Sequence, residues 1–115
     1  MYNIIHMKRY GINIKERIVD LKASLKKNKK YVATIKDINT NIKKKIDFGD
    51  ARYQQYKDRT NIKKYSYKDH LDKNRRINYF RRFSKTNNKK TALKREFKKS
   101  GGRYTSKLLS HLYLW

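Results

Sequence analysis

The sequence contains no cysteine, no proline, only 4 glycines and only 9 acidic residues among 115. Without cysteine there is no disulfide framework, no thiolate nucleophile and no cysteine-bound zinc. No stretch approaches the roughly 18 apolar residues that a membrane-spanning helix needs, and residues 1–10 lack the apolar centre of a secretory signal. We therefore expect a soluble, intracellular protein that uses no cofactor and has no membrane among its partners.

The dominant feature of what is present is positive charge. The chain carries 33 Lys and Arg, which leaves a formal net charge of +24, and basic residues are in excess in both halves. Such a charge favours a polyanionic partner, nucleic acid above all. Hydrophobic residues make up only 37 % of the chain, but 10 Tyr, 4 Phe and 1 Trp supply large side chains for burial. We expect a single folded domain with a thin core.

Alternating apolar and polar residues predict three strands, over residues 18–26, 31–36 and 42–48. Polar residues at 27–30 and 37–41 would form the turns between them. The side chains predicted to face the core are Val19, Leu21, Ala23 and Leu25 in the first strand, Tyr31, Ala33 and Ile35 in the second, and Ile42, Lys44, Ile46 and Phe48 in the third. Because a lysine falls on that side, the third strand should be an edge, or Lys44 should extend its stem over the core.

Helices are predicted after Gly49. Asp50 would cap a short helix over 51–58, and residues 66–69 would cap a longer one with an apolar stripe running from Leu71 to Phe83. Thr91 would cap a helix over 92–99 that ends at residues 100–102, and Thr105 would begin a last helix. The predicted fold is α+β: a small three-stranded antiparallel meander followed by three or four short helices. Residues 18–115 would form one basic domain, and residues 1–17 an arm or an extra strand.

The strongest candidate for nucleic-acid binding is the basic and aromatic run at 73–85, because arginine forks match phosphate geometry. A second basic cluster at 85–103 extends it. The competing interpretation is that these are solvated charges on amphipathic helices. The predicted phosphate-binding residues are Lys73, Arg75, Arg76, Arg81, Arg82, Lys85, Lys89, Lys90, Lys94, Arg95, Lys98, Lys99 and Arg103.

Other polar residues give weaker signals. Lysines at 26, 27, 29 and 30 and at 43–45 could grip a nucleic-acid backbone or only keep sheet edges from pairing. The tyrosines could stack on bases, but core packing is the favoured interpretation. His70 lies between Asp69 and Asp72, which could suggest a metal site or a general base. A capping or packing role is favoured, because Asp69 suits the first turn of a helix. No residue set assembles a catalytic or metal site, so an enzyme is not expected.

Three separated blocks of the sequence resemble one protein family. Residues 46–58, IDFGDARYQQYKD, resemble an IHFGD-x-RYQQYKD motif, with Asp47 where the family commonly has His. His70, Asp72, Arg75, Arg76, Tyr79 and Arg82 are similar to an H-x-D...RR...Y...R helix, and residues 100–115 resemble an SGGKYT...LSHKYLW ending. The family consists of short basic proteins of large nucleocytoplasmic DNA viruses related to mimivirus. The resemblance covers residues 18–115.

The resemblance implies a virion protein, or one located in the cytoplasmic viral factory, and it carries no catalytic residue. It also implies that Phe48, Gly49, Tyr53 and Tyr56 form a strand-to-helix junction that defines the fold. The leading hypothesis is a non-enzymatic viral structural protein that binds DNA or RNA backbone with little sequence preference, in genome packaging or organisation. The alternative is a minor capsid or cement protein that contacts acidic capsid subunits, in which the N-terminal arm and the apolar residues 108–115 make protein contacts. A ribosomal-RNA-binding protein and a small nuclease are further alternatives, and the oligomeric state stays open.

Overall fold

The computed structural model describes residues 11–115 and confirms the α+β class. Strands β1 (Glu16–Ala23), β2 (Lys29–Asp37) and β3 (Lys43–Asp50) form an antiparallel sheet in the order β1-β2-β3, which is the predicted meander. A short 3₁₀ turn, η2 (Ser66–Lys68), precedes helices α1 (Lys73–Ser84), α2 (Lys89–Lys99) and α3 (Ser106–Tyr113).

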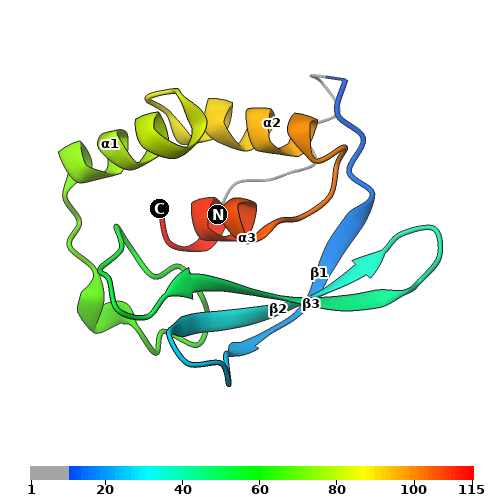
Figure 1. The fold of residues 1–115 in the computed structure, drawn as a ribbon, viewed down its shortest axis with the longest axis horizontal. Helices are drawn as coiled ribbons and strands as arrows, with labels where there is room; N and C mark the ends of the chain where they lie inside the picture. Colours follow the sequence, from blue (N-terminus) through cyan, green and yellow to red (C-terminus); the bar gives the residue numbers. More distant parts are fainter. Residues whose placement is uncertain (1–10) are drawn as a thin grey trace.

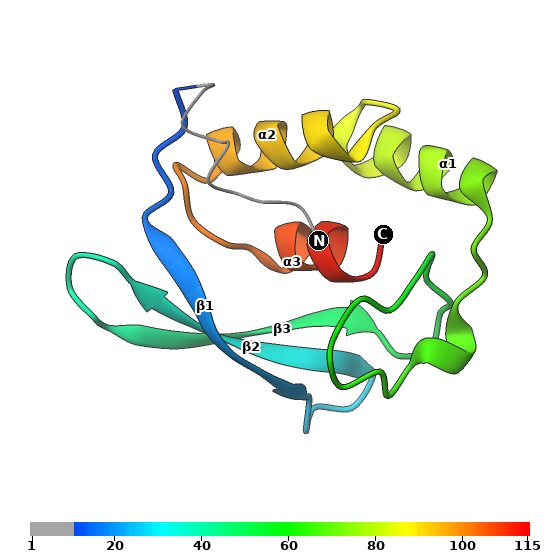
Figure 2. The ribbon, with the colours of Figure 1, turned by 180° about the vertical axis from the view of Figure 1, so that it is seen from behind.

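The elements are stacked in layers, with α3 in the middle (Figure 1). The sheet lies on one side of α3, and α1 and α2 lie end to end on the other side. The view from behind shows the same order (Figure 2). A helix enclosed in this way must be apolar on most of its surface. In α3 the side chains of Leu108, Leu109, His111, Leu112 and Tyr113 are all buried.

The predicted alternation holds in β2 and fails in part of β1. Tyr31, Ala33 and Ile35 are completely buried in β2. In β1 the register shifts between Ile18 and Asp20. A bulge adds one residue and reverses which side chains face the core. Ile18 and Leu21 therefore pack on the core, whereas Val19 is 39 % exposed, so its prediction as a core residue was wrong. Leu25, also predicted to face the core, lies beyond β1 and is fully exposed.

Strand β3 is an edge strand, as its lysine suggested. Phe48 is completely buried and Ile46 packs against the core. Ile42, predicted on the same side, precedes the strand and is 70 % exposed. Lys44 is half exposed, and its Nζ lies 3.0 Å from a carboxylate oxygen of the buried Glu16. A lysine is accepted on the core side here because it meets a buried acid at the sheet edge.

The predicted helix over residues 51–58 does not form, and this is the main error in the predicted fold. The segment is irregular, with a single parallel bridge between Gln55 and Asp69. Asp50 instead closes a local turn, accepting a hydrogen bond from the Arg52 amide at 3.0 Å. Gln55 and Asp58 are buried and hydrogen-bonded to distant parts of the chain. These tertiary hydrogen bonds override the helical pattern of the two tyrosines.

The helix ends are partly as predicted. Thr105 caps α3, accepting from the Leu108 amide at 3.1 Å, and α2 ends before Gly101 as expected. Two predicted caps were wrong. Asp72 caps α1 in place of residues 66–69, and Asn88 caps α2 in place of Thr91. In both cases a short polar side chain nearer the helix start accepts the exposed amide hydrogens.

The described part of the N-terminal segment belongs to the domain. Ile12 is 5 % exposed within the core, and the Lys15 amide donates to the Gly102 carbonyl oxygen at 3.0 Å. Gly102 has φ +85, and a Cβ there would lie 1.9 Å from the Asn13 carbonyl oxygen, so a side chain is excluded. The interpretation of residues 1–10 as an arm or strand lies outside the described residues.

Candidate nucleic-acid interface

Helices α1 and α2, which together we call the helical layer, present cations to solvent with very little acid among them. Their only acidic residue is Glu96, which is 6 % exposed and turned inward to the Ser84 hydroxyl at 2.8 Å. The exposed cations of the layer and its connecting loop are Lys73, Arg75, Arg81, Arg82, Lys85, Lys90, Arg95, Lys98 and Lys99. The acids of the chain are largely occupied elsewhere, so this surface has an uncompensated positive field.

Several of the predicted phosphate-binding residues also have contacts within the fold. The Arg76 guanidinium lies over the Tyr56 ring at 4.7 Å, and its Nε donates to the Trp115 carbonyl oxygen at 2.8 Å. Arg95 donates to the carbonyl oxygens of Ser84 and Lys85. Arg103 is paired with Glu16 and Asp37, at 3.2 and 3.0 Å.

Lys89 is another of these residues. It is only 3 % exposed, and its Nζ donates to the Leu112 carbonyl oxygen at 3.0 Å. Burial, with Arg59 and Arg76 nearby, lowers the pKa of Lys89 to about 7. Sequence reasoning could not separate Lys89 from its exposed neighbour Lys90, because one residue of helical rotation distinguishes an inner position from an outer one.

Arg103 belongs to a cluster around Glu16, which is 3 % exposed. One Glu16 oxygen accepts from the Tyr104 amide at 2.8 Å, and the other is paired with Lys44 and Arg103. Burial alone would raise the pKa of this carboxyl, but the Tyr104, Lys44 and Arg103 donors outweigh it and lower the pKa. The cluster ties β1 and β3 to the loop before α3.

The segment from 51 to 72, which we call the polar segment, is held by buried side-chain hydrogen bonds. Gln55 is completely buried. Its oxygen accepts from the Lys30 ammonium, and its nitrogen donates to the Asp69 carboxylate at 2.6 Å. Asp69 also accepts from the Asp58 amide at 2.7 Å. Asp69 thus fixes a loop and does not cap a helix as predicted.

Lys30 is a second buried lysine that the sequence pattern did not reveal. Its neighbours at the hairpin tip are exposed, whereas Lys30 is 2 % exposed. Burial is the main cause that lowers its pKa, to about 8, and Lys68 acts in the same direction. Lys30 is therefore a structural partner of Gln55 and is removed from the lysines proposed to grip a backbone.

Asp58 forms the second anchor of the polar segment. It is 1 % exposed and accepts from the Tyr31 hydroxyl, from the Thr60 amide at 3.0 Å and from the Thr60 hydroxyl at 2.6 Å. Burial, followed by the hydrogen bond to Asp58, raises the pKa of Tyr31 to about 12. Both Gln55 and Asp58 fall in the RYQQYKD block, the one signal that could have marked them. Within that block Tyr56 is half-buried and Tyr53 is 65 % exposed.

Gly49 joins β3 to the polar segment by a close approach, as its predicted role required. It has φ +77, and a Cβ there would lie 2.7 Å from Leu114 Cδ1 and 3.2 Å from Lys30 Cβ. Phe48 and Gly49 are thus tightly packed, but they lead from a strand to an irregular segment and not to a helix.

A buried polar chain links the helices. The His111 ring lies 2.8 Å from the Tyr79 hydroxyl through Nδ1 and 2.8 Å from the Ser84 hydroxyl through Nε2. Ser84 in turn donates to Glu96. Burial, with Lys107 and Lys89 nearby, lowers the pKa of His111 to about 3. Ser84 is 2 % exposed and His111 is completely buried, so this serine–histidine pair packs the helices together and does not face solvent.

His70 has the packing role favoured from the sequence. Its Nδ1 accepts from the Asp72 amide at 2.9 Å, and its ring packs against Trp115 and Tyr56. Burial, followed by Arg75, lowers the pKa of this imidazole. Among residues 11–115 no group of three His, Cys, Asp or Glu side chains is placed to hold a metal ion.

A row of cations also crosses the face of the sheet that points away from α3. Arg17, Lys36 and Lys43 are direct partners across β1, β2 and β3. Like charges in this position repel one another. The same face carries acids, however: Lys22 lies 3.6 Å from Asp20, and Lys26 lies 3.2 Å from Asp47. The sheet face is thus of mixed sign, unlike the helical layer.

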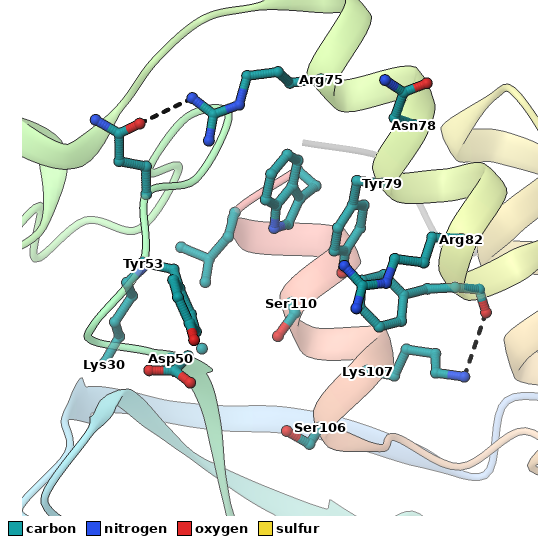
Figure 3. A pocket seen from close by; sticks show the side chains of 15 residues that line it. Lys30, Asp50, Tyr53, Arg75, Asn78, Tyr79, Arg82, Ser106, Lys107 and Ser110 are labelled. Atoms are coloured by element: carbon teal, nitrogen blue, oxygen red, sulfur yellow. Dashed lines mark hydrogen bonds between the residues drawn. The ribbon is translucent and has the colours of Figure 1, made fainter.

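A cleft opens beside the helical layer (Figure 3). It has a volume of about 860 Å³, within the usual size range of ligand sites. Its walls come from α1, from α3 with the two residues that end the chain, from the end of β3 with the start of the polar segment, and from Lys30 of β2. Tyr53 stands on one side of the opening, and Arg82 and Lys107 stand on the other.

Comparison of the chain with protein-family models, with curated proteins and with solved structures finds no match. Within residues 11–115, no helix is both long enough and apolar enough to cross a membrane. The fold and the site thus define a small, strongly basic α+β domain.

Proposed function

We propose that this protein is a non-enzymatic nucleic-acid-binding protein that contacts the phosphate backbone through its helical layer, with little sequence preference. The observation that supports the proposal best is the separation of charge across α1 and α2. Most of their cations are exposed, whereas their only acid, Glu96, is buried against Ser84. Glu96 is also ion-paired with Lys99 and Lys107, at 3.8 and 3.7 Å, so it compensates little of the remaining charge. A surface of this kind attracts any polyanion and contains no set of side chains dedicated to reading bases.

Arginine gives the layer more than charge. Arg82 lies over the Phe83 ring at 5.3 Å, and Arg81 donates to the Asn87 side chain. These contacts hold the guanidinium groups near the surface, which reduces the entropy lost when each one binds a phosphate. Genome packaging or organisation in a virus is the setting that the family resemblance suggests for such binding.

The test is a binding titration with fluorescent duplex DNA, single-stranded DNA and RNA over a series of salt concentrations, using nuclease-treated protein. Each neutralised phosphate contributes about −0.9 to the slope of log K against log salt for duplex DNA. We expect a slope steeper than about −4, which corresponds to at least about five phosphates. A salt-insensitive complex, or binding no tighter than that of polylysine of similar charge, would contradict the proposal.

The alternative of a capsid or cement protein rested on the apolar residues 108–115. In the structure Leu108, Leu109, Leu112 and Leu114 are at most 2 % exposed and belong to the core. Their apolar character is thus explained by folding, and removing them should unfold the domain. No other observation on the described residues favours that alternative over nucleic-acid binding.

A further inference from the structure

We propose that the cleft beside α1 accepts one unpaired nucleobase of a single-stranded nucleic acid, with the attached phosphates held at its rim. This inference rests on the proposed function, because it assigns a place for the base of a strand whose backbone lies on the helical layer. It adds a preference for single strands that a uniformly basic surface would not have.

The first observation is an exposed aromatic ring at the mouth of the cleft. Tyr53 is 65 % exposed although it lies in a fixed segment, and the Arg52 guanidinium covers its ring at 5.7 Å. Exposed aromatic rings next to cations are the usual platforms on which single-stranded bases stack. Most other aromatic side chains of the domain are packed: Tyr79, for example, is stacked on Trp115 with ring centroids 4.0 Å apart.

The second observation is a set of hydrogen-bonding groups inside the cleft without protein partners. Asn78 and Ser110 both line it. Neither side chain makes a hydrogen bond to another group of residues 11–115. Amide and hydroxyl groups of this kind can donate to and accept from the edge of any base.

The third observation is the charge at the rim. Arg75, Arg82 and Lys107 line the cleft, and all three are exposed. Arg75 and Lys107 also contact other side chains of the domain, at 2.9 and 3.7 Å. The one acidic side chain of the lining, Asp50, is bound by Arg52 through two hydrogen bonds of 3.0 and 2.8 Å. The Arg52 pair also holds the pKa of Asp50 at about 2. Because exposed contacts of this kind contribute little stability, these cations can turn to phosphates on either side of an inserted base, and the acid is compensated.

The geometry also restricts the form of nucleic acid. A base in a duplex is stacked and paired, so it reaches a concave site only if it leaves the helix, at a cost of a few kcal/mol. The bases of a single strand are already unpaired, so little of this cost applies to them. DNA and RNA share the ring and the phosphate, so either could supply the base.

The experiment compares three 12-nucleotide ligands with equal phosphate counts: a single strand, the same strand in which every base is replaced by an abasic site, and a mixed strand with one central base. Both deoxyribose and ribose versions are titrated with the full chain at one fixed salt concentration. Stacking of one base typically changes affinity by about 5- to 150-fold. We expect the abasic strand to bind at least about 5-fold more weakly than the strand with one base.

Variants locate the effect. Tyr53→Ala should remove the difference between the abasic and one-base strands, and Asn78→Ala should reduce it. Tyr67→Ala is the matched control, because Tyr67 is 75 % exposed, carries the Lys68 ammonium over its ring at 5.8 Å and lies outside the cleft. It should leave the difference unchanged. Tyr53 and Asn78 are both exposed, so these variants should fold.

The outcomes separate the two proposals. If the wild type binds the abasic strand as tightly as the one-base strand, the cleft takes no base, although backbone binding stands. If Tyr67→Ala abolishes the difference in affinity as fully as Tyr53→Ala does, the base stacks outside the cleft, and the assignment of the base to the cleft is wrong. If the salt series described for the proposed function shows no steep dependence for any nucleic acid, the proposed function fails and this inference fails with it. A larger effect in the ribose or the deoxyribose series would identify the kind of strand.

Discussion

The polar segment and the helical layer use polar side chains in opposite ways. In the polar segment, Gln55, Asp58 and Asp69 point inward and replace regular secondary structure as the source of order. In the helical layer, ordinary α-helices satisfy their own backbone, so the charged side chains are left to face solvent. The difference teaches that a high density of charge does not by itself mark a binding surface. A charged side chain can bind a ligand only where it is not already buried and hydrogen-bonded within the fold.

The same contrast holds between neighbouring lysines. Lys29 is exposed, whereas the next residue, Lys30, is buried; Lys90 is exposed, whereas the preceding residue, Lys89, is buried. Both buried lysines are at most 3 % exposed and donate hydrogen bonds to protein oxygens. Each buried ammonium needs a partner, because an unpaired buried charge is strongly unfavourable. Two lysines of this basic chain are therefore unavailable to any polyanion.

The largest effect should come from breaking the anchor of the polar segment. Asp58→Ala leaves the Tyr31 hydroxyl, the Thr60 hydroxyl and two backbone amides without their buried acceptor. We expect the free energy of unfolding to fall by about 3 to 5 kcal/mol, measured by urea denaturation. Asp72→Ala is the control: Asp72 is an exposed helix cap, and its loss should lower stability by only about 1 kcal/mol. Equal losses in the two variants would contradict the anchoring role.

A smaller effect should follow from filling the close approach at Gly49. A Cβ there would meet Leu114 Cδ1 at 2.7 Å and would sit on a backbone with φ +77. We expect Gly49→Ala to lower the free energy of unfolding by about 2 kcal/mol. Gly101→Ala separates the two causes, because Gly101 has φ +66 but nothing within 4 Å of the added Cβ. It should lose about 1 kcal/mol, and a loss as large as that of Gly49→Ala would show that the contact with Leu114 is unimportant.

The smallest effect concerns the dependence of stability on pH. The folded-state pKa of Lys89 is lowered to about 7 and that of Lys30 to about 8, below the 10.5 of the unfolded chain. Between these values the unfolded state binds more protons, so stability rises as pH increases from 7 toward 10. Above pH 10 the raised pKa of Tyr31 reverses the trend. Lys89→Met should reduce the rise between pH 7 and pH 8 by about 1 kcal/mol.

The control for that measurement is Lys90→Met, since Lys90 is exposed on the same helix. The free energy of unfolding of this variant should depend on pH in the same way as that of the wild type. Urea denaturation at several pH values gives both curves. A Lys89→Met curve parallel to that of the wild type would mean that the Lys89 ammonium keeps its charge at little cost when buried.

The regular parts of this fold could be predicted from the sequence because they follow local periodicity. The meander, the inward face of β2, the end of α2 and the Thr105 cap depend on neighbouring residues alone. The bulge at Val19 and the irregular course of residues 51–58 could not be predicted in this way. Both depend on contacts between distant residues, such as Tyr31 with Asp58.

The sequence predicted the candidate site as a set of basic residues. In the structure some of these residues are exposed, and others are bonded within the fold. The sequence placed Arg82 and Lys98 on helices, where they are exposed. It could not show that Arg103 would bridge Glu16 and Asp37, or that the Lys89 side chain would reach the Leu112 carbonyl oxygen. Nor could it reveal the cleft, which is formed by four separate segments of the chain.

The central claim is that the helical layer, and not total charge, binds nucleic acid. Two triple variants remove the same charge from the two basic surfaces: Arg81→Gln, Lys85→Gln and Lys98→Gln in the helical layer, and Arg17→Gln, Lys36→Gln and Lys43→Gln in the row across the sheet. None of the six residues lines the cleft. Relieving the repulsion between like charges in the row should leave the sheet at least as stable.

The deciding measurement is the slope of log K against log salt for both triple variants and the wild type, on one single-stranded oligonucleotide. Each lost phosphate contact should make the slope less negative by about 0.7 on a single strand. We predict a change of about 2 for the helical-layer variant and little change for the sheet variant. Equal changes in the two variants would contradict the account, because binding would then follow total charge and not the surface that the fold presents.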